Sequence, residues 1–361
     1  MNPPAALREI RRFDPERPLE EATTPPASWY TEPAILALER ERVFRRTWQL
    51  VARADQLERA GAYVAGSLLG LPYLIVRGQD GELRAFANVC AHHATVLLRG
   101  EGCVERITCP YHGWTYDLAG RLVRATGAGG MRGFEREAFG LRALQLRSSG
   151  ALVFLAWDSD PSAFDPDGVL QTPDLWSSAA GPLRFVAQEI YTVRCNWKVV
   201  VDNYLDGGYH VAILHPELAA SLDMEGYETH VLSRSVIQRV EAKAEACDRR
   251  LGERALYAWG HPTWMLNRYG AILDVNRVVP IDVTQTRVTF DFFMAPDRAS
   301  DPELVRASLA ASRRIQLEDG EICERVQEGL GSGAYDLGRY APRFEAGAHR
   351  FHCLLARDLA G

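Results

Sequence analysis

Two short segments of this chain each combine one cysteine with one histidine. Cys90 and His92 form a Cys-x-His pair, and Cys109 and His112 form a Cys-x-x-His pair farther along. Zinc fingers usually place their cysteines together and their histidines together. Mixed pairs suit a [2Fe–2S] cluster in which two thiolates hold one iron and two imidazoles hold the other. We therefore predict that Cys90 and Cys109 bind one iron and that His92 and His112 bind its neighbour; a structural Cys2His2 zinc site is the alternative.

A second group of candidate metal ligands lies in residues 196–216, NWKVVVDNYLDGGYHVAILHP. Asp202, Asp206 and His210 are spaced by four residues, which would place them on one face of a helix. His215 follows just before a proline that can turn its imidazole back toward the same face. Two histidines and one carboxylate, with open positions opposite, form the facial triad of non-haem Fe(II) oxygenases. Two satisfied histidines near a helix end would be the simpler interpretation if this segment stood alone.

The carboxylate of such a triad has more than one candidate. Asp206 is close to both histidines in sequence, but it could serve as a bridging group instead of a ligand. Glu318 and Asp319 lie in the last long helical pattern, where a pair of acids is usually only a solvated helix face. The residues alone leave this choice open.

The composition is that of an ordinary globular chain. Of the 361 residues, 47% are hydrophobic and 24% are charged, and the formal net charge is −6. No apolar run approaches the roughly 18 residues of a membrane span, and the arginines are scattered among acids instead of forming a basic stripe. The N-terminus lacks the apolar region of a secretory signal. We expect a cytoplasmic protein with no nucleic-acid partner and no membrane partner.

The elements that must position these residues form a β module followed by a larger α+β domain. Residues 1–28 are rich in proline and should form an irregular arm, and the histidines and cysteine near the C-terminus should lie on a strand. Short apolar runs separated by glycine turns predict the β module, and Asn196 and Asp301 should cap helices. The predicted units are residues 1–45 as an arm and helix that pack with the catalytic domain, 46–158 as the cluster domain, and 159–361 as the catalytic domain.

The two metal motifs together resemble the α-subunits of Rieske non-haem iron oxygenases, the ring-hydroxylating family. The resemblance covers the chain from about residue 29 onward and is most pronounced for the choline monooxygenase branch. It implies a β Rieske domain and a catalytic domain whose antiparallel sheet is gripped by helices. It also implies that the iron ligands are His210, His215 and Asp319. The catalytic group would comprise Asp206 with its neighbours Asp202 and Asn203, and His93 stands where the family usually has arginine.

The family resemblance also predicts partners and cofactors. Asp206 would correspond to the acid that links a cluster histidine of one subunit to an iron histidine of the next, which implies a homotrimer. The cofactors would be a Rieske [2Fe–2S] cluster and mononuclear Fe(II). Because the chain shows no dinucleotide-binding motif, NAD(P)H would act only through a separate ferredoxin or flavin reductase.

The predicted substrate is a small quaternary ammonium compound, oxidised with O2. Choline would give betaine aldehyde hydrate, and a betaine would instead lose an N-methyl group. Aromatic faces attract such cations, so we expect Trp259 or Trp264 in the pocket, with Tyr204 and Tyr209 flanking the iron. One alternative is oxygenation or O-demethylation of an aromatic acid. A more distant alternative is a Rieske electron carrier without catalysis of its own.

Overall fold

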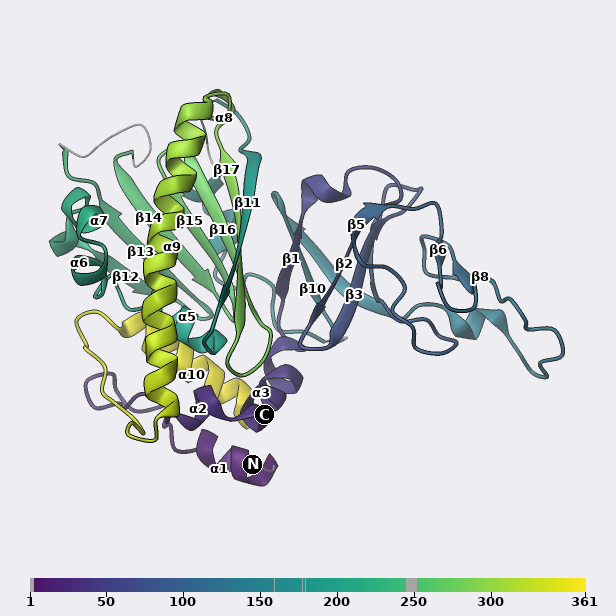
Figure 1. Ribbon diagram of the computed structural model, residues 1–361, viewed down its shortest axis with the longest axis horizontal. Coiled ribbons are helices and arrows are strands. Elements are labelled where there is room, and N and C mark those ends of the chain that lie inside the picture. Colours follow the sequence, from purple (N-terminus) through teal and green to yellow (C-terminus); the bar gives the residue numbers. More distant parts are fainter. Residues whose placement is uncertain (1–2, 159, 177, 179, 245–251) are drawn as a thin grey trace. The chain divides into compact units, whose positions relative to one another are not determined.

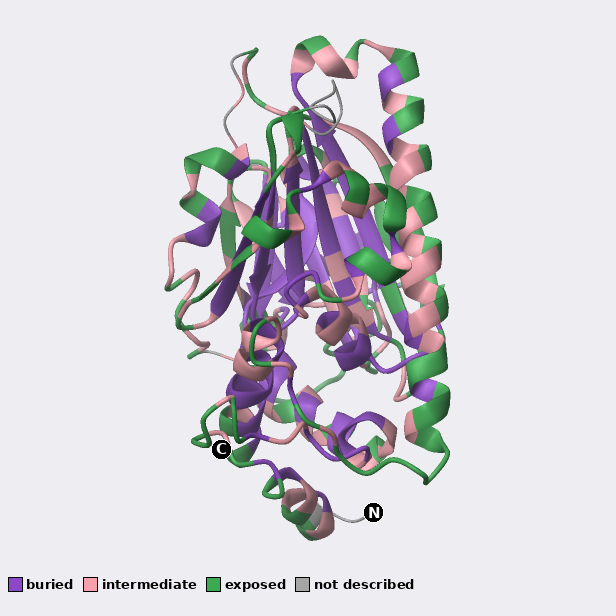
Figure 2. Cartoon of the chain, turned by 90° about the vertical axis from the view of Figure 1, so that its left-hand side faces the viewer, coloured by how far each residue is buried: buried purple, intermediate pink, exposed green. Residues whose placement is uncertain are grey.

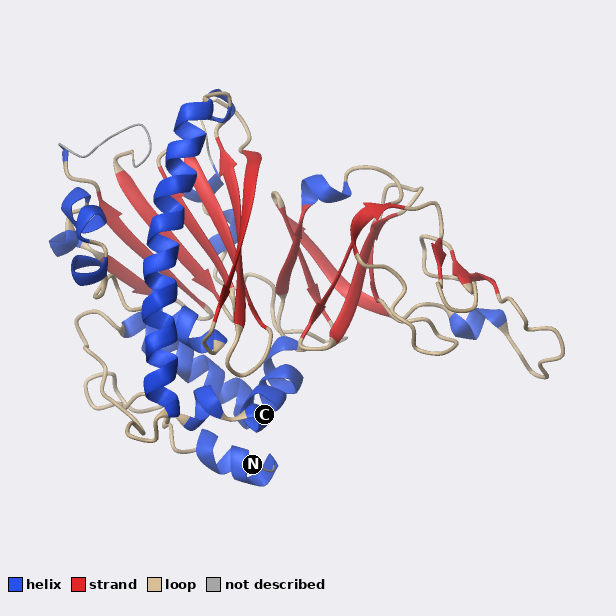
Figure 3. Ribbon diagram, viewed as in Figure 1, coloured by secondary structure: helices blue, strands red, loops and turns tan. Residues whose placement is uncertain are grey.

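The computed structural model describes residues 3–158, 160–176, 178, 180–244 and 252–361. The chain divides into two compact units, Phe44–Phe164 and the combination of Met1–Val43 with Asp165–Gly361. Each unit contains an antiparallel sheet, and the long helices belong to the larger unit (Figure 1, Figure 3). The predicted α+β class is thereby confirmed. Within the described ranges, no helix combines the length and apolar character that crossing a membrane requires.

The smaller unit is the predicted β module. Its main sheet has the strand order β1-β10-β9-β4-β3-β2-β5, and a three-stranded sheet has the order β6-β7-β8. The turn between β2 and β3 uses Leu69 and Gly70, whose φ angles of 47° and 75° suit a tight hairpin turn. The strands are β1 (Gln49–Arg53), β2 (Ala62–Leu68), β3 (Leu71–Arg77), β4 (Leu83–Ala87), β5 (Gly100–Cys103), β6 (Ile107–Thr108), β7 (Thr115–Tyr116), β8 (Leu122–Arg124), β9 (Ala143–Ser149) and β10 (Leu152–Ala156).

The larger unit is organised around a seven-stranded antiparallel sheet of order β11-β17-β16-β15-β14-β13-β12. Its central strands are buried along nearly their whole length (Figure 2). The strands are β11 (Arg184–Val193), β12 (Glu228–Val231), β13 (Ser235–Glu241), β14 (Arg254–Gly260), β15 (Trp264–Tyr269), β16 (Ile272–Pro280) and β17 (Thr286–Met294).

Two capped helices of the larger unit carry the candidate iron site. Asn196 accepts the Lys198 backbone N–H at 3.1 Å and begins α5 (Trp197–Tyr204). Asp301 accepts two backbone N–H groups and begins α9 (Pro302–Gly331), which runs beside the sheet (Figure 1). Both predicted caps are confirmed. The other α-helices are α1 (Pro3–Ile10), α2 (Ser28–Thr31), α3 (Pro33–Glu39), α4 (Pro173–Trp176), α6 (Val211–Leu214), α7 (Pro216–Ser221), α8 (Pro296–Ala299) and α10 (Ala346–Ala360).

Two local predictions are wrong. The proline-rich start is not wholly irregular, because α1 forms within it and packs with α3 and α10. His349, His352 and Cys353 lie on helix α10 instead of a strand, because a helical apolar face there buries Phe351 and Leu355 in the core.

Candidate metal centres and substrate pocket

The loops after β4 and β6 bring the two Cys/His pairs together in the smaller unit. Each cysteine carbonyl accepts the backbone N–H of the residue four positions later: Ala94 donates to Cys90 at 3.0 Å, and Gly113 donates to Cys109 at 3.1 Å. Ala94 and Gly113 have positive φ angles of 56° and 70°. Both loops therefore curl back tightly, which groups the candidate ligand side chains.

The side chains of this group fit the predicted cluster. The rings of His92 and His112 lie with their centroids 4.8 Å apart, and the Nδ1 atoms of both are buried without a hydrogen-bond partner in the described part of the chain. Buried ring nitrogens normally have a partner, so these two are suited to binding a metal. The thiols of Cys90 and Cys109 are also buried, as ligands of a cluster shielded from water should be.

Neighbouring groups favour the thiolate form of Cys109. Burial by itself would raise the pKa of the Cys109 thiol, but hydrogen bonds from the backbone N–H groups of Tyr111 and His112 lower it below its ordinary value. The Tyr116 hydroxyl lies 3.3 Å from Cys90 Sγ and accepts the Ala91 N–H at 3.0 Å. Donors around cluster sulfurs are one of the means by which proteins tune cluster potential.

His93 lies beside the candidate cluster ligands without joining them. It is exposed, and its ring centroid is 4.0 Å from that of His92 and 5.4 Å from that of His112. His92 also stacks on Trp114, at 4.6 Å with an interplanar angle of 8°. The buried Trp114 therefore packs on one face of the His92 ring, and His93 lies beside that ring at the surface.

The larger unit brings His210, His215 and Asp319 to one point. One potential ligand atom from each lies within 4.8 Å of the others. Asp319 Oδ1 is 2.9 Å from His215 Nε2 and 3.6 Å from His210 Nε2, so both imidazoles present the same nitrogen to the carboxylate. Two imidazole nitrogens and one carboxylate oxygen on one side are the donor set of a mononuclear iron site.

The local charge favours a bound cation. Burial would lower the pKa of His215, but its hydrogen bonds to the Asp319 and Glu318 carboxylates outweigh burial and raise that pKa above its ordinary value. The same negative field that stabilises a protonated imidazole would stabilise a divalent metal at the facing nitrogens. The donor set and its electrostatics therefore both fit the predicted iron.

The continuous helix predicted through this segment is wrong. Helix α5 ends at Tyr204, and α6 begins only at Val211. Between them Gly207 and Gly208 adopt φ angles of 67° and 75°, outside the helical range. A side chain at Gly207 would meet the Phe344 carbonyl, with a Cβ only 2.2 Å from its oxygen. The glycine pair in the sequence was the signal for this break, and the four-residue spacing concealed it.

Asp206 organises the turn that replaces the helix. Its Oδ2 atom lies 2.6 Å from His210 Nδ1 and accepts the His210 backbone N–H at 3.0 Å. Its Oδ1 atom accepts the Gly208 N–H at 3.0 Å and the Tyr209 N–H at 3.2 Å. The carboxylate therefore points His210 Nε2 toward Asp319, the arrangement that histidine ligands of metals commonly require.

Glu318 has a role that the sequence did not indicate. Its Oε2 atom lies 2.6 Å from His215 Nδ1, while the opposite nitrogen of the ring faces Asp319. Glu318 is therefore a positioning residue for His215, as Asp206 is for His210. The sequence offered no signal for it, because 103 residues separate the two partners.

Replacing Glu318 with glutamine is expected to weaken iron binding by about 10- to 100-fold, the usual effect of removing a partner of a metal ligand. Iron retained after dialysis against graded chelator concentrations measures this directly. Glu321→Gln is the matched control, because Glu321 is exposed on the same helix. Equal iron retention in the two variants would show that Glu318 does not position His215.

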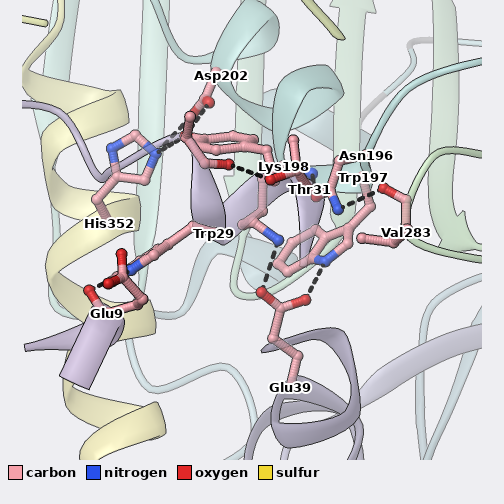
Figure 4. A network of polar contacts seen from close by, with 12 residues as sticks. Glu9, Trp29, Thr31, Glu39, Asn196, Trp197, Lys198, Asp202, Val283 and His352 are labelled. Carbon is pink, nitrogen blue, oxygen red and sulfur yellow. Dashed lines mark hydrogen bonds and ion pairs between the residues drawn. The ribbon is translucent and has the colours of Figure 1, made fainter. Parts of the chain in front are cut away.

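Asp202 and Asn203 are adjacent in sequence, but their side chains have different surroundings. Asn203 lines the pocket described below, whereas Asp202 is not among its lining residues. The Asp202 carboxylate accepts the Tyr30 hydroxyl at 2.8 Å and lies 2.9 Å from His352 Nε2 (Figure 4). Its assignment to the catalytic group is therefore corrected: Asp202 ties α5 to α2 and α10.

A pocket lies against the candidate iron ligands, and its free volume is about 990 Å³ with the solvent at its mouth included. His210, His215 and Asp319 form part of its wall. Of the lining residues that the structure describes, none is lysine or arginine. Burial raises the pKa of Tyr204 and Tyr227 well above the ordinary value, so these phenols are neutral. The aromatic lining residues are Tyr191, Tyr204, Tyr227, Tyr257, Tyr269 and Phe290.

Three of the four predicted substrate residues do not line this pocket. Trp259 shares a sheet face with Tyr257 but lies farther along β14, where Phe351 of α10 covers it at a ring distance of 5.6 Å. Trp264 has the opposite strand parity to the lining residues Met265 and Asn267, so it faces the other side of the sheet. Tyr209 is 54% exposed and stacks on Phe344. Tyr204 alone of the four is in the wall, and its hydroxyl donates to Asn267 Oδ1 at 2.7 Å.

Known proteins share both halves of this architecture. Residues 181–361 match the family described as "Ring hydroxylating alpha subunit (catalytic domain)", and residues 47–135 match "Rieske [2Fe-2S] domain". The chain is 40% identical over 364 residues to the chloroplastic choline monooxygenase of Arabidopsis thaliana, covering 97% of this chain and 86% of that protein. It is 31% identical over 359 residues to the carnitine monooxygenase oxygenase subunit of Escherichia coli (strain K12), covering 94% of each.

Solved structures agree with these sequence matches. A quaternary ammonium Rieske monooxygenase in complex with its substrate L-carnitine superposes with a TM-score of 0.80 at 26% identity, covering 94% of this chain and 96% of that chain. A naphthalene 1,2-dioxygenase from Rhodococcus sp. superposes with a TM-score of 0.79 at 17% identity, covering 99% and 97%, and shares the fold. The chain therefore belongs to the ring-hydroxylating α-subunit family of Rieske non-haem iron oxygenases, whose cofactors are a [2Fe–2S] cluster and a mononuclear iron.

Proposed function

We propose that this enzyme oxidises choline to betaine aldehyde hydrate. The observation that carries the proposal is the pocket itself, in which neutral aromatic rings adjoin the candidate iron ligands and the described lining residues include no lysine or arginine. A trimethylammonium group is attracted to such rings. A substrate carboxylate would find no cationic partner among those residues, so an amino alcohol fits better than a betaine or an aromatic acid.

Cys90, Cys109, His92 and His112 would hold the [2Fe–2S] cluster, and His210, His215 and Asp319 would hold the iron. When bound, the iron supplies O2 activation and the cluster supplies an electron to it. The protein's own part is orientation: Asp206 and Glu318 fix the two imidazoles, and the aromatic wall holds the substrate cation. The oxygenation adds one oxygen atom to the carbinol carbon and releases the other as water, consuming two electrons and two protons.

The electrons come from a separate donor protein, as in other members of this family. We propose a ferredoxin or flavin reductase that draws on NAD(P)H, and a homotrimer in which Asp206 links the cluster of one subunit to the iron of the next. Exposed apolar residues near each centre support an interface between copies. Tyr111, which stacks on the ligand His112, is 65% exposed, and Ile213, between the two iron histidines in sequence, is 87% exposed.

Tyr257→Leu tests the aromatic recognition of the cation. The Tyr257 ring packs edge-on against Tyr204 and Tyr269, with centroid distances of 6.4 and 5.7 Å, and is central to the aromatic wall. Loss of one cation–π contact is expected to weaken choline binding by about two- to thirty-fold. Calorimetric titration of the oxygen-free enzyme measures the dissociation constant.

A comparison of a charged ligand with an uncharged ligand of the same shape separates recognition of the cation from simple packing. The uncharged carbon analogue of choline, with a tert-butyl group in place of trimethylammonium, should lose much less affinity in Tyr257→Leu. Tyr209→Leu should leave the ratio of the two affinities unchanged, because this tyrosine lies outside the pocket. If Tyr257→Leu weakens both ligands equally, the rings do not recognise the positive charge, and the proposal loses its main support.

A further inference from the structure

Gln238 is a polar residue in the aromatic wall of the pocket. It lies on β13 directly opposite Tyr257 on β14, and it lines the pocket while being only 1% exposed. Its neighbours on β13, Ile237 and Arg239, have the opposite strand parity. A fully buried glutamine among tyrosines is unusual unless its amide has partners for both its donor and its acceptor.

Among the residues that the structure describes, only one end of the Gln238 amide has such a partner. Its Nε2 atom donates to the Tyr204 backbone carbonyl at 3.0 Å. This bond fixes which end of the amide is the nitrogen, so Oε1 must point the other way. The Oε1 atom is buried and has no hydrogen-bond partner in the described part of the chain. Gln238, a lining residue of the pocket, therefore carries a buried acceptor whose donor is not among the described residues.

A buried acceptor left unpaired is destabilising, and Gln238 is a lining residue of the pocket, so the occupant of the pocket is the candidate source of the donor. The trimethylammonium group has no O–H or N–H, and the aromatic rings already account for its charge. The hydroxyl is the only donor that choline has. A carboxylate in the same place would bring a second acceptor against Oε1 and would be repelled.

From this geometry we infer that Gln238 is a specificity-determining residue whose Oε1 accepts a hydrogen bond from the substrate hydroxyl. The inference rests on the proposed function, since it requires a quaternary ammonium alcohol in the pocket. It explains how one site can accept the alcohol and reject the carboxylate formed from it by later oxidation. It also ties recognition to α5, because the same amide is anchored on the carbonyl of Tyr204 at the end of that helix.

The test varies the ligand and the side chain together. Choline is compared with ethyltrimethylammonium, which has hydrogen in place of the hydroxyl, by calorimetric titration of the oxygen-free holoenzyme. Wild type should bind choline roughly tenfold more tightly, the usual effect of a ligand group that pairs a buried acceptor. Gln238→Met should bind the two ligands about equally. Any loss of packing at Tyr204 in this variant would weaken both ligands alike and cancel in the ratio.

Gln188→Met is the matched control. Gln188 lies on β11 of the same sheet, is not among the lining residues, and its Nε2 donates to Asp291 Oδ1 at 2.6 Å. This variant should keep the preference for choline. The inference is overturned if Gln238→Met keeps that preference, if Gln188→Met abolishes it, or if wild type binds both ligands equally. Wild type that binds both equally leaves the proposed function standing, whereas binding of neither ligand overturns that function as well.

Discussion

Replacing Asp319 with asparagine is expected to abolish turnover while leaving the iron–sulfur cluster intact. The carboxylate is the only charged member of the candidate ligand set, and its Oδ1 lies close to both imidazole nitrogens. A neutral amide of the same size removes the charge that holds a divalent metal. Without the metal, the transition state loses several kcal/mol of stabilisation, which corresponds to a fall in turnover of at least about 1000-fold.

Metal analysis and visible spectroscopy together distinguish this effect from misfolding. Asp319→Asn should lose the mononuclear iron and keep the cluster absorption, because the cluster ligands belong to the other compact unit. Glu321→Gln, an exposed acid two residues away, should keep both metals and its activity. Wild-type turnover in Asp319→Asn would show that the iron is bound elsewhere.

Replacing Asp206 with asparagine is expected to lower turnover by about 100-fold or more, even when the variant is loaded with excess iron so that both metal centres are occupied. The single oxygen of asparagine can still accept the Gly208 and Tyr209 backbone N–H groups, so most of the turn should keep its shape, but its NH2 group cannot accept the His210 N–H. It cannot supply the negative charge next to His210 Nδ1, and loss of such a partner alone costs about 10- to 100-fold. The proposed role of Asp206 in the electron path adds to this loss.

The reoxidation rate of the cluster tests that additional role. The enzyme is reduced chemically, freed of reductant, and mixed with O2 and choline, and the cluster absorption is followed with time. Asp206→Asn should reoxidise far more slowly than wild type, whereas Glu318→Gln loaded with excess iron should reoxidise at nearly the wild-type rate. Equal rates in Asp206→Asn and wild type would exclude Asp206 from the electron path.

Local patterns in the sequence predicted the parts of the site that depend on local geometry. The Cys/His spacings of the two cluster loops and the caps at Asn196 and Asp301 each involve residues within a few positions of one another. The iron triad was harder to predict, because 104 residues separate Asp319 from His215 in the sequence. The spacing of the residues left the carboxylate ligand undecided, and only the family resemblance selected Asp319 over Asp206 and Glu318.

The predictions that failed depended on tertiary structure. Strand parity correctly places Trp259 on the same face as Tyr257, but parity does not reveal that α10 covers that end of the strand. A four-residue spacing likewise cannot show that Gly207 must pack against the Phe344 carbonyl, which ends the helix. The proposed role of Gln238 could not be predicted either, because it depends on a single hydrogen bond between its amide and the Tyr204 carbonyl.

A single-turnover experiment tests the central claim most directly. The iron-loaded enzyme is reduced, separated from the reductant and mixed with O2 and one candidate substrate at a time, and the products are identified by mass spectrometry. The panel comprises choline, carnitine, glycine betaine and a methoxybenzoate. Betaine aldehyde from choline, containing oxygen derived from O2 in its hydrate, is the predicted result. Product from the methoxybenzoate with none from choline would contradict the assignment of a quaternary ammonium alcohol as the substrate.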